Sequence, residues 1–140
     1  MFIYRGFWMV TWFKQEFGHR EAVEAHKRGV AAEVVLDEVI RDIPQGSMGF
    51  LLQTHWSPTV SNKFAKGAII GFGDIHTRAH IYKAIFEGLC FELRRLQEIV
   101  QKKTGVAIRE VRVGGGGSRS DAVVQIAADM FNLPVFRLAT

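Results

Sequence analysis

The chain has 140 residues, of which 48% are apolar and 23% charged, and its formal net charge is +4 at pH 7. A chain of this length can bury enough surface for one hydrophobic core without disulfides or metal ions. Its single cysteine excludes an internal disulfide, and no apolar run reaches the roughly 18 residues that span a bilayer.

These properties predict one cytoplasmic domain over residues 1–140, with no membrane partner. The apolar opening, residues 1–13, contains Arg5 and no small-residue cleavage site follows it, so we interpret it as core and not as a signal peptide. The basic residues are spread along the chain, and their nearest approach to a cluster, within residues 92–103, is interspersed with glutamates. This is typical of a solvated helix face, and we expect no nucleic-acid partner.

Glycine and proline divide the first half of the chain into short predicted elements. A strand over residues 2–6 ends at Gly6, and a helix over 7–17 ends at Gly18, where we expect a left-handed helix stop. Further along we predict helices over 20–28 and 31–41, a strand within 49–56, an exposed loop over 57–66 and an apolar segment over 67–72.

The strongest local signal is a helix from about Thr77 to Lys103. Its apolar residues recur every three to four positions and form one stripe, and Gly105 ends it. The chain then shows a strand pattern over 107–113, four glycines, a helical pattern over 121–131 and a strand over 134–137. This alternation predicts an α/β domain with neighbouring parallel strands.

Four glycines and a serine, Gly114–Ser118, separate that strand from the second helix. A flexible linker would join independent parts through polar, unpatterned chain, whereas this segment has the length of a strand-to-helix loop. Glycine allows positive φ and leaves the backbone open to a flat ligand. We therefore predict a shaped turn that receives a ligand, with a tight turn for close packing of helix on strand as the alternative.

The turn lacks two features of phosphate-binding loops, because no lysine follows the glycines and the spacing of a dinucleotide motif is absent. Ser118 and Asp121 stand in the spacing of a capping box, and a first-turn carboxylate competes with phosphate at a helix N-terminus. We therefore expect the turn to contact the ribose and base of a nucleotide.

Several other residues have both a structural and a functional interpretation. His76 and His80 have the spacing of metal ligands on a helix, but no third ligand is evident, so we favour a structural role. Asp74 is expected to cap the long helix with Thr77, and Glu87 to be a buried hydrogen-bonding partner. We interpret Cys90, Trp8, Trp12 and Trp56 as core or interface residues, with a ligand contact by Trp56 as the alternative.

Residues 67–99 run from a glycine through apolar residues to a histidine and an acid, and residues 111–137 hold the glycine turn. Together these stretches resemble the C-terminal domain of the FGGY family of carbohydrate kinases, and the likeness covers most of the chain from Gly49 onward. Phe72 is larger than the aliphatic residue that the family pattern prefers. The signature is carried by Gly67, Ile69, Gly71, His80, Ile81, Ala84, Ile85, Phe86 and Glu87.

The resemblance implies an actin-like ATPase fold, related to ribonuclease H, with a mixed sheet and flanking helices. It implies ATP-dependent phosphorylation of a sugar or polyol such as glycerol, xylulose, ribulose or gluconate, with Mg²⁺ in the complete enzyme. Carried over residue by residue, it assigns adenosine contacts to Gly115, Gly116 and Ser120. Gly6 matches a glycine near the nucleotide through a looser alignment.

The family's general base is an aspartate of the N-terminal domain, which these 140 residues do not contain by this resemblance, so we expect no catalytic residue here. We expect a fragment of the C-terminal domain that binds ATP or ADP, meets the sugar through the missing domain and is inactive alone. A non-catalytic binding or assembly module on an actin-like fold is the alternative. Apolar surface that the missing domain would cover could support a homodimer.

Overall fold

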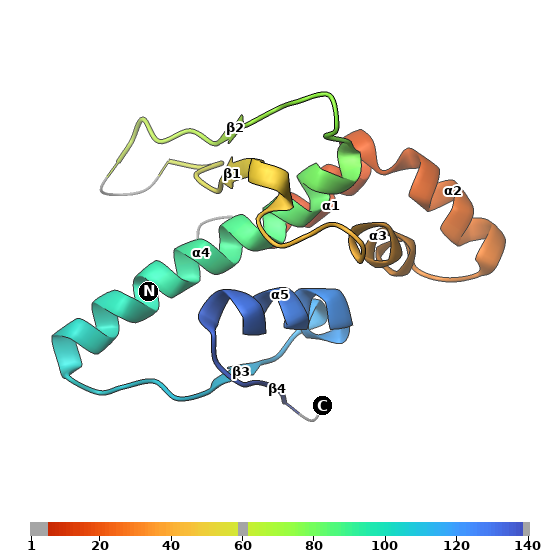
Figure 1. Cartoon of the computed structure of the whole chain (residues 1–140). Helices are drawn as coiled ribbons and strands as arrows, with labels where there is room; N and C mark the ends of the chain where they lie inside the picture. The colour runs from red at the N-terminus through yellow and green to blue at the C-terminus, as the bar shows by residue number, and fades with distance from the viewer. Residues whose placement is uncertain (1–5, 59–61, 139–140) are drawn as a thin grey trace.

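A computed structural model describes residues 6–58 and 62–138 of the chain, so most of the strand expected over 2–6 lies outside the described residues. Three helices come first, followed by a small hairpin, a long helix and a strand–helix–strand unit (Figure 1). No helix within the described ranges has the length and apolarity that crossing a membrane requires.

The three opening helices are α1 (Trp8–Phe17), α2 (His19–Arg28) and α3 (Ala32–Ile40), close to their predicted bounds. The left-handed stop predicted at Gly18 is wrong, because Gly18 has a φ of −92°. A Cβ on Gly18 would lie 2.9 Å from the Cα of Lys14, so glycine is needed there for close backbone approach. Gly29 ends α2 with a φ of 64°, which favours glycine.

A short 3-10 turn (Ser47–Gly49) leads into a hairpin of β1 (Leu51–Gln53) and β2 (Ala68–Ile70). The two strands pair antiparallel, with Leu51 opposite Ile70. The strand predicted within 49–56 is therefore present but shorter, and the apolar segment over 67–72 supplies its partner.

The long helix α4 (Arg78–Thr104) is the central element of the fold, and α1, α3, α5 and β1 all pack against it. It has 27 residues and ends at Gly105, whose φ of 71° is left-handed. Ten of its residues are buried, nine of them between Ile81 and Cys90, so its first half holds the core. The second half extends away from the opening helices in Figure 1.

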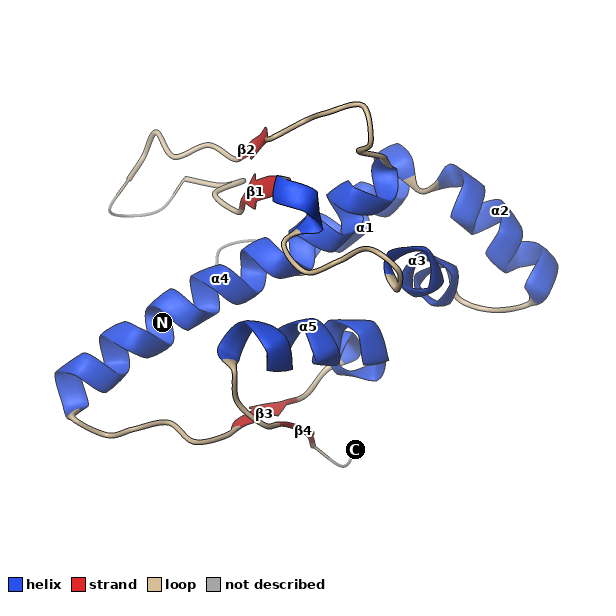
Figure 2. Cartoon of the chain, viewed as in Figure 1, coloured by secondary structure: helices blue, strands red, loops and turns tan. Residues whose placement is uncertain are grey.

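The final unit is β3 (Val111–Val113), a 3-10 turn (Gly116–Arg119), α5 (Asp121–Phe131) and β4 (Val135–Arg137). β3 and β4 pair in parallel, with Val111 opposite Val135, so the predicted parallel neighbours are confirmed. In the described ranges the strands form two separate two-stranded sheets (Figure 2), where we had expected one mixed sheet with flanking helices.

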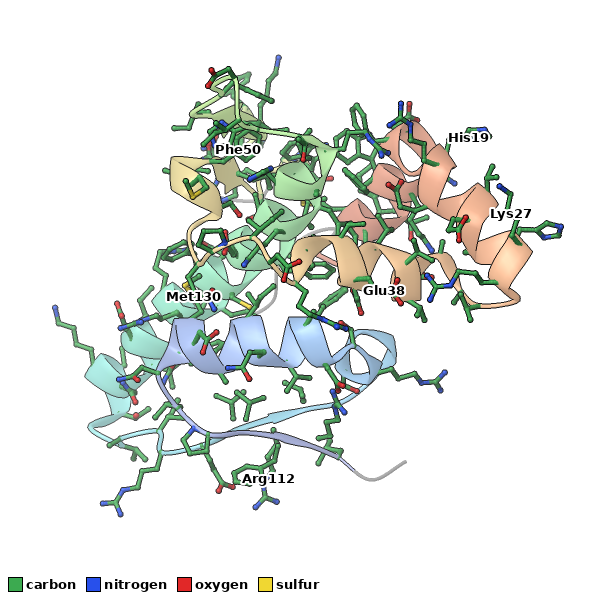
Figure 3. All side chains as sticks on the ribbon, turned by 45° about the vertical axis from the view of Figure 1, so that its right-hand side comes forward. His19, Lys27, Glu38, Phe50, Arg112 and Met130 are labelled. Atoms are coloured by element: carbon green, nitrogen blue, oxygen red, sulfur yellow. The ribbon has the colours of Figure 1, made fainter. Side chains whose placement is uncertain are left out.

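One apolar core joins the opening helices to the long helix and to α5. Phe13 of α1, Leu36 of α3 and Ile126 of α5 all pack into it with the buried face of α4. Two of the basic residues on the second half of α4, Arg94 and Arg95, form exposed ion pairs with Glu98 and Glu92, as predicted for a solvated face. Figure 3 shows Arg112 of β3 and Lys27 of α2 on the outside of the molecule.

Candidate nucleotide-binding site

The glycine turn is an ordered corner between β3 and α5. Gly115 has a φ of 88° and a ψ of −173°, a combination that is essentially restricted to glycine, and residues 116–119 then form one 3-10 turn. This geometry excludes the flexible-linker interpretation of Gly114–Ser118, because the segment has a defined path within one strand–turn–helix unit. The shaped turn is therefore present, and its contact with a ligand stays a prediction.

Gly116 and Gly117 differ in what lies next to their Cα atoms. A Cβ on Gly116 would have no heavy atom within 4 Å, so the backbone there faces open space. A Cβ on Gly117 would lie 2.5 Å from the ring of Phe7, so that aromatic ring packs directly on the backbone. Gly116 can therefore be approached from outside, whereas Gly117 is needed for contact with the start of α1.

Ser120, not Ser118, caps α5, so the predicted Ser118–Asp121 capping box is wrong. The Ser120 Oγ accepts a hydrogen bond from the Val123 N–H at 3.1 Å, which satisfies a backbone donor of the first turn. Ser118 instead donates its hydroxyl proton to the Gly115 carbonyl oxygen at 2.7 Å and stabilises the 3-10 turn. The spacing of Ser118 and Asp121 suggested Ser118 as the cap. The 3-10 turn over residues 116–119 contains Ser118, so α5 begins later and Ser120 is its N-cap.

Asp121 lies on the first turn of α5 and forms an ion pair with Arg137 of β4. Its side chain is almost fully exposed, so this pair makes only a small contribution to stability. The pair offsets part of the negative charge that Asp121 brings to the helix N-terminus.

A cavity of about 510 Å³ lies beside the turn, within the range of small-molecule sites. Most of its lining is apolar, and the polar groups come from Ser120, Asp37, Thr11 and the ends of three charged side chains. Gly116 and Gly117 form part of its wall. An apolar cavity with a few convergent polar groups suits the flat base and the hydroxyls of a nucleoside. Its other lining residues include Phe7, Val10, Val34, Tyr82 and Phe86.

The predicted site residues gather only partly around this cavity. Gly116 and Ser120 line it, whereas Gly115 contributes the bend that directs the chain toward it. Gly6 is not among the lining residues; its carbonyl oxygen accepts a hydrogen bond from the Met9 N–H at the start of α1. Gly6 is adjacent in sequence to Phe7, which does line the cavity.

Asp37 of α3 is a polar lining residue that the sequence analysis missed. Burial raises the pKa of its carboxyl, although a hydrogen bond from Ser120 acts in the opposite direction. The sequence held a signal for it, because Asp37 follows Leu36 and precedes Ile40 by three residues, and both of these are buried in α3. An acid among core positions is a signal of function or of a specific partner.

The two histidines have structural roles, as predicted. His80 Nδ1 accepts a hydrogen bond from the Thr77 N–H at 3.0 Å and caps α4. His76 Nδ1 accepts from the Gly73 N–H at 2.8 Å. The predicted cap by Thr77 is confirmed, in a capping box that Thr77 forms with His80, whereas Asp74 takes no part in it.

The remaining candidates are also structural. Glu87 is 3% exposed and hydrogen-bonds the turn before β1, as expected. Burial raises the pKa of the Cys90 thiol to about 12, which makes it a core residue and not a nucleophile. Trp56 packs against Trp12, with ring centroids 5.4 Å apart, and lies over Gly67. The described residues contain no cluster of His, Cys, Asp or Glu that could hold a metal ion.

These observations define an α/β domain with a rigid glycine corner beside a nucleoside-sized cavity. The chain belongs to the FGGY family of carbohydrate kinases, since the model of that family's C-terminal domain matches residues 10–140. The fold is that of the actin-like ATPases. The fold class and the resemblance stated from the sequence are both confirmed.

Individual relatives agree with this assignment. The chain is 29% identical over 137 residues to an uncharacterized sugar kinase of Escherichia coli, covering 98% of the chain and 28% of the relative. It is 31% identical to the xylulose kinase of Bacillus subtilis, covering 92% of the chain and 24% of that protein.

Solved structures show the same relation. The xylulose kinase from Rhodospirillum rubrum superimposes with a TM-score of 0.74 at 28% identity, covering 93% of the chain and 25% of that structure. The Plasmodium falciparum glycerol kinase with ADP reaches a TM-score of 0.70 at 17% identity, over 91% and 24%, and so shows the fold alone. The chain spans about a quarter of the length of these proteins.

Proposed function

We propose that this chain supplies the adenosine-binding side of an ATP-dependent sugar or polyol kinase. The observation that carries the proposal is the open backbone at Gly116, held in place by the glycine-only conformation of Gly115, beside an apolar cavity. Membership of a carbohydrate kinase family makes ATP or ADP the nucleotide to expect there.

The phosphorylation itself needs further groups besides a nucleotide site. Phosphoryl transfer depends on a base that meets the substrate hydroxyl and on cations that stabilise the transferred group. The Mg²⁺ that the family implies finds no fitting ligand cluster among the described residues, so we assign it no ligands here. We propose that residues 1–140 are a single domain, the nucleotide side of a longer enzyme, and that they are inactive alone.

The direct test is calorimetric titration of the chain with ADP, with Gly116→Leu as the disrupting variant. Gly116 has an ordinary φ and an unobstructed Cβ position, so the variant should fold while its side chain fills the approach to the backbone. We expect weak, saturable binding by the parent, and an affinity lower by about tenfold, or about 1.4 kcal/mol, in the variant.

Gly73→Leu is the matched control. Its φ is also ordinary, its Cβ would be at van der Waals distance from His76, and it lies outside the cavity lining. The control should bind ADP as the parent does. Absence of heat change and of any thermal shift at millimolar ADP would instead favour a non-catalytic binding or assembly module on this fold.

A further inference from the structure

Lys83 of α4 is a buried cation that the proposed nucleotide site does not use. It is only 4% exposed, although lysine is rarely buried without a paired charge. Its Nζ donates a hydrogen bond to the carbonyl oxygen of Ile43, just beyond the end of α3. No acid among the described residues forms an ion pair with it. The other two protons of the ammonium group therefore have no acceptor in the described part of the chain.

Lys83 lines a cavity of about 470 Å³ between α3 and α5, which pack against each other (Figure 1). Two further cations line the same cavity, Arg41 at the end of α3 and Arg119 of the 3-10 turn. Both arginines are exposed, and neither is ion-paired to an acid that the structure describes. Three segments that are distant in sequence thus bring three cations without a paired acid to one cavity.

The acids that line this cavity offset the three cations only in part. Glu38 is held by Arg28 through two hydrogen bonds of 2.7 and 2.8 Å, and Asp121 forms an ion pair with Arg137. Neither of these two arginines lines the cavity. The third acid, Asp37, is half-buried, and burial raises the pKa of its carboxyl, which makes its charge costly to maintain. The unpaired charge around the cavity is therefore mostly positive.

We propose that this cavity binds a phosphate group, free or carried by a small ligand, with Lys83 as its buried donor and Arg41 and Arg119 as exposed donors. Lysine recognises phosphate as a point charge, and arginine recognises it through a planar pair of N–H groups. A bound anion would supply the charge and the acceptors that the buried ammonium group lacks. The volume of the cavity lies within the range of small-molecule sites.

The phosphate site is distinct from the nucleoside cavity, although the two are neighbours. They share Asp37, Arg119 and Ser120, whereas Lys83 and Arg41 line only the phosphate cavity. The inference therefore does not require a nucleoside to bind beside the glycine turn.

The alternative is a purely structural lysine. A cation near the C-terminal end of a helix interacts favourably with the last carbonyl groups, and the bond from Lys83 to Ile43 lies at the end of α3. This role would contribute to stability but would give the chain no affinity for phosphate. Phosphate binding thus separates the two explanations.

The test is calorimetric titration of the chain with inorganic phosphate at constant ionic strength. We expect weak, saturable binding by the parent. Lys83→Met keeps the length of the side chain without its charge and should lower the phosphate affinity by about tenfold or more. Arg41→Gln removes an exposed cation, so it should fold as the parent does, and it should lower the affinity by about threefold.

Arg109→Gln is the matched control for Arg41→Gln. Arg109 is also exposed and lines neither the phosphate cavity nor the nucleoside cavity, so this variant changes the net charge equally and should bind phosphate as the parent does. Three results would overturn the inference. They are no phosphate binding by the parent at millimolar concentration, equal losses in the two arginine variants, or a Lys83→Met variant that loses stability but keeps the parent's affinity.

A second titration distinguishes a nucleotide phosphate from another phosphate-bearing ligand. ADP and adenosine are compared in the parent and in Arg41→Gln. A loss confined to ADP would assign the cavity to the phosphates of the nucleotide, and unchanged ADP binding beside weakened phosphate binding would assign it to a separate ligand. If the chain binds neither ADP nor adenosine, the proposed function fails, and the titration with inorganic phosphate still decides the phosphate site.

Discussion

His80 shows how a single side chain can define the start of the longest helix. Its Nδ1 accepts the Thr77 N–H, so the neutral ring with an unprotonated Nδ1 is the form that the fold uses. Burial, followed by the charges of His76 and Lys83, lowers the pKa of His80 below its ordinary 6.5. Helix capping thus gives this histidine a structural role.

A pH-dependent loss of stability follows from this cap. The folded-state pKa of His80 lies below the unfolded value, so its contribution is fully present above about pH 6.5 and is lost as the pH falls through the lowered pKa. Thermal melts of the parent and His80→Gln from pH 8 to pH 5 should show a steeper decline in the parent. Parallel declines would mean that the cap has no pH dependence.

At the scale of elements, the turn of residues 46–49 is fixed to α4 by one buried carboxylate. Glu87 Oε1 accepts the Gly46 N–H at 2.9 Å, and Oε2 accepts the Ser47 hydroxyl proton at 2.7 Å. Ser47 and Met48 both have positive φ, at 46° and 59°, which non-glycine residues rarely adopt without outside support. The turn is what directs β1 onto α4.

Removing this carboxylate should therefore be costly. We expect Glu87→Ala to lower the free energy of unfolding by about 2–3 kcal/mol, because one buried and one partly buried donor lose their acceptor. Urea denaturation measures the loss. Glu98→Ala, which removes only an exposed ion pair with Arg94, should change stability by less than about 1 kcal/mol. Equal losses would argue against a special role for Glu87.

At the scale of the whole molecule, an apolar cleft of about 930 Å³ lies between the second half of α4 and the β3–α5 unit. Leu89, Leu93 and Leu96 of α4 form one side, and the valines of β3 lie on the other. An open apolar cleft of this kind is the candidate contact surface for the homodimer that the sequence analysis expects.

Self-association through this cleft can be measured by analytical ultracentrifugation over a range of concentrations. We predict that Leu93→Lys shifts the chain toward monomer, because the new charge would be buried in an apolar contact. Val39→Lys is the control, since Val39 and Leu93 are both 42% exposed and Val39 lies outside the cleft. An identical response of both variants would exclude the cleft as the contact surface.

Most of the helices could be predicted because single residues in the sequence mark where they end. Gly29 and Gly105 stop α2 and α4 in left-handed conformations, and Asn132 ends α5 in the same way with a φ of 50°. The site was only partly predictable. The glycine corner was found because it is contiguous, whereas Asp37 lies about eighty residues away and lines the same cavity as Ser120 only after the helices pack together.

The amino-acid sequence alone therefore determined the helical pattern, the strand–turn–helix unit and the family, because each depends on neighbouring residues or on contiguous motifs. Tertiary structure decided which serine caps α5, which polar residues line the cavity beside the glycine turn and how the strands divide into two sheets. Those outcomes depend on packing between segments that are distant in sequence, where the cost of an unpaired buried group is set by partners that no local pattern specifies.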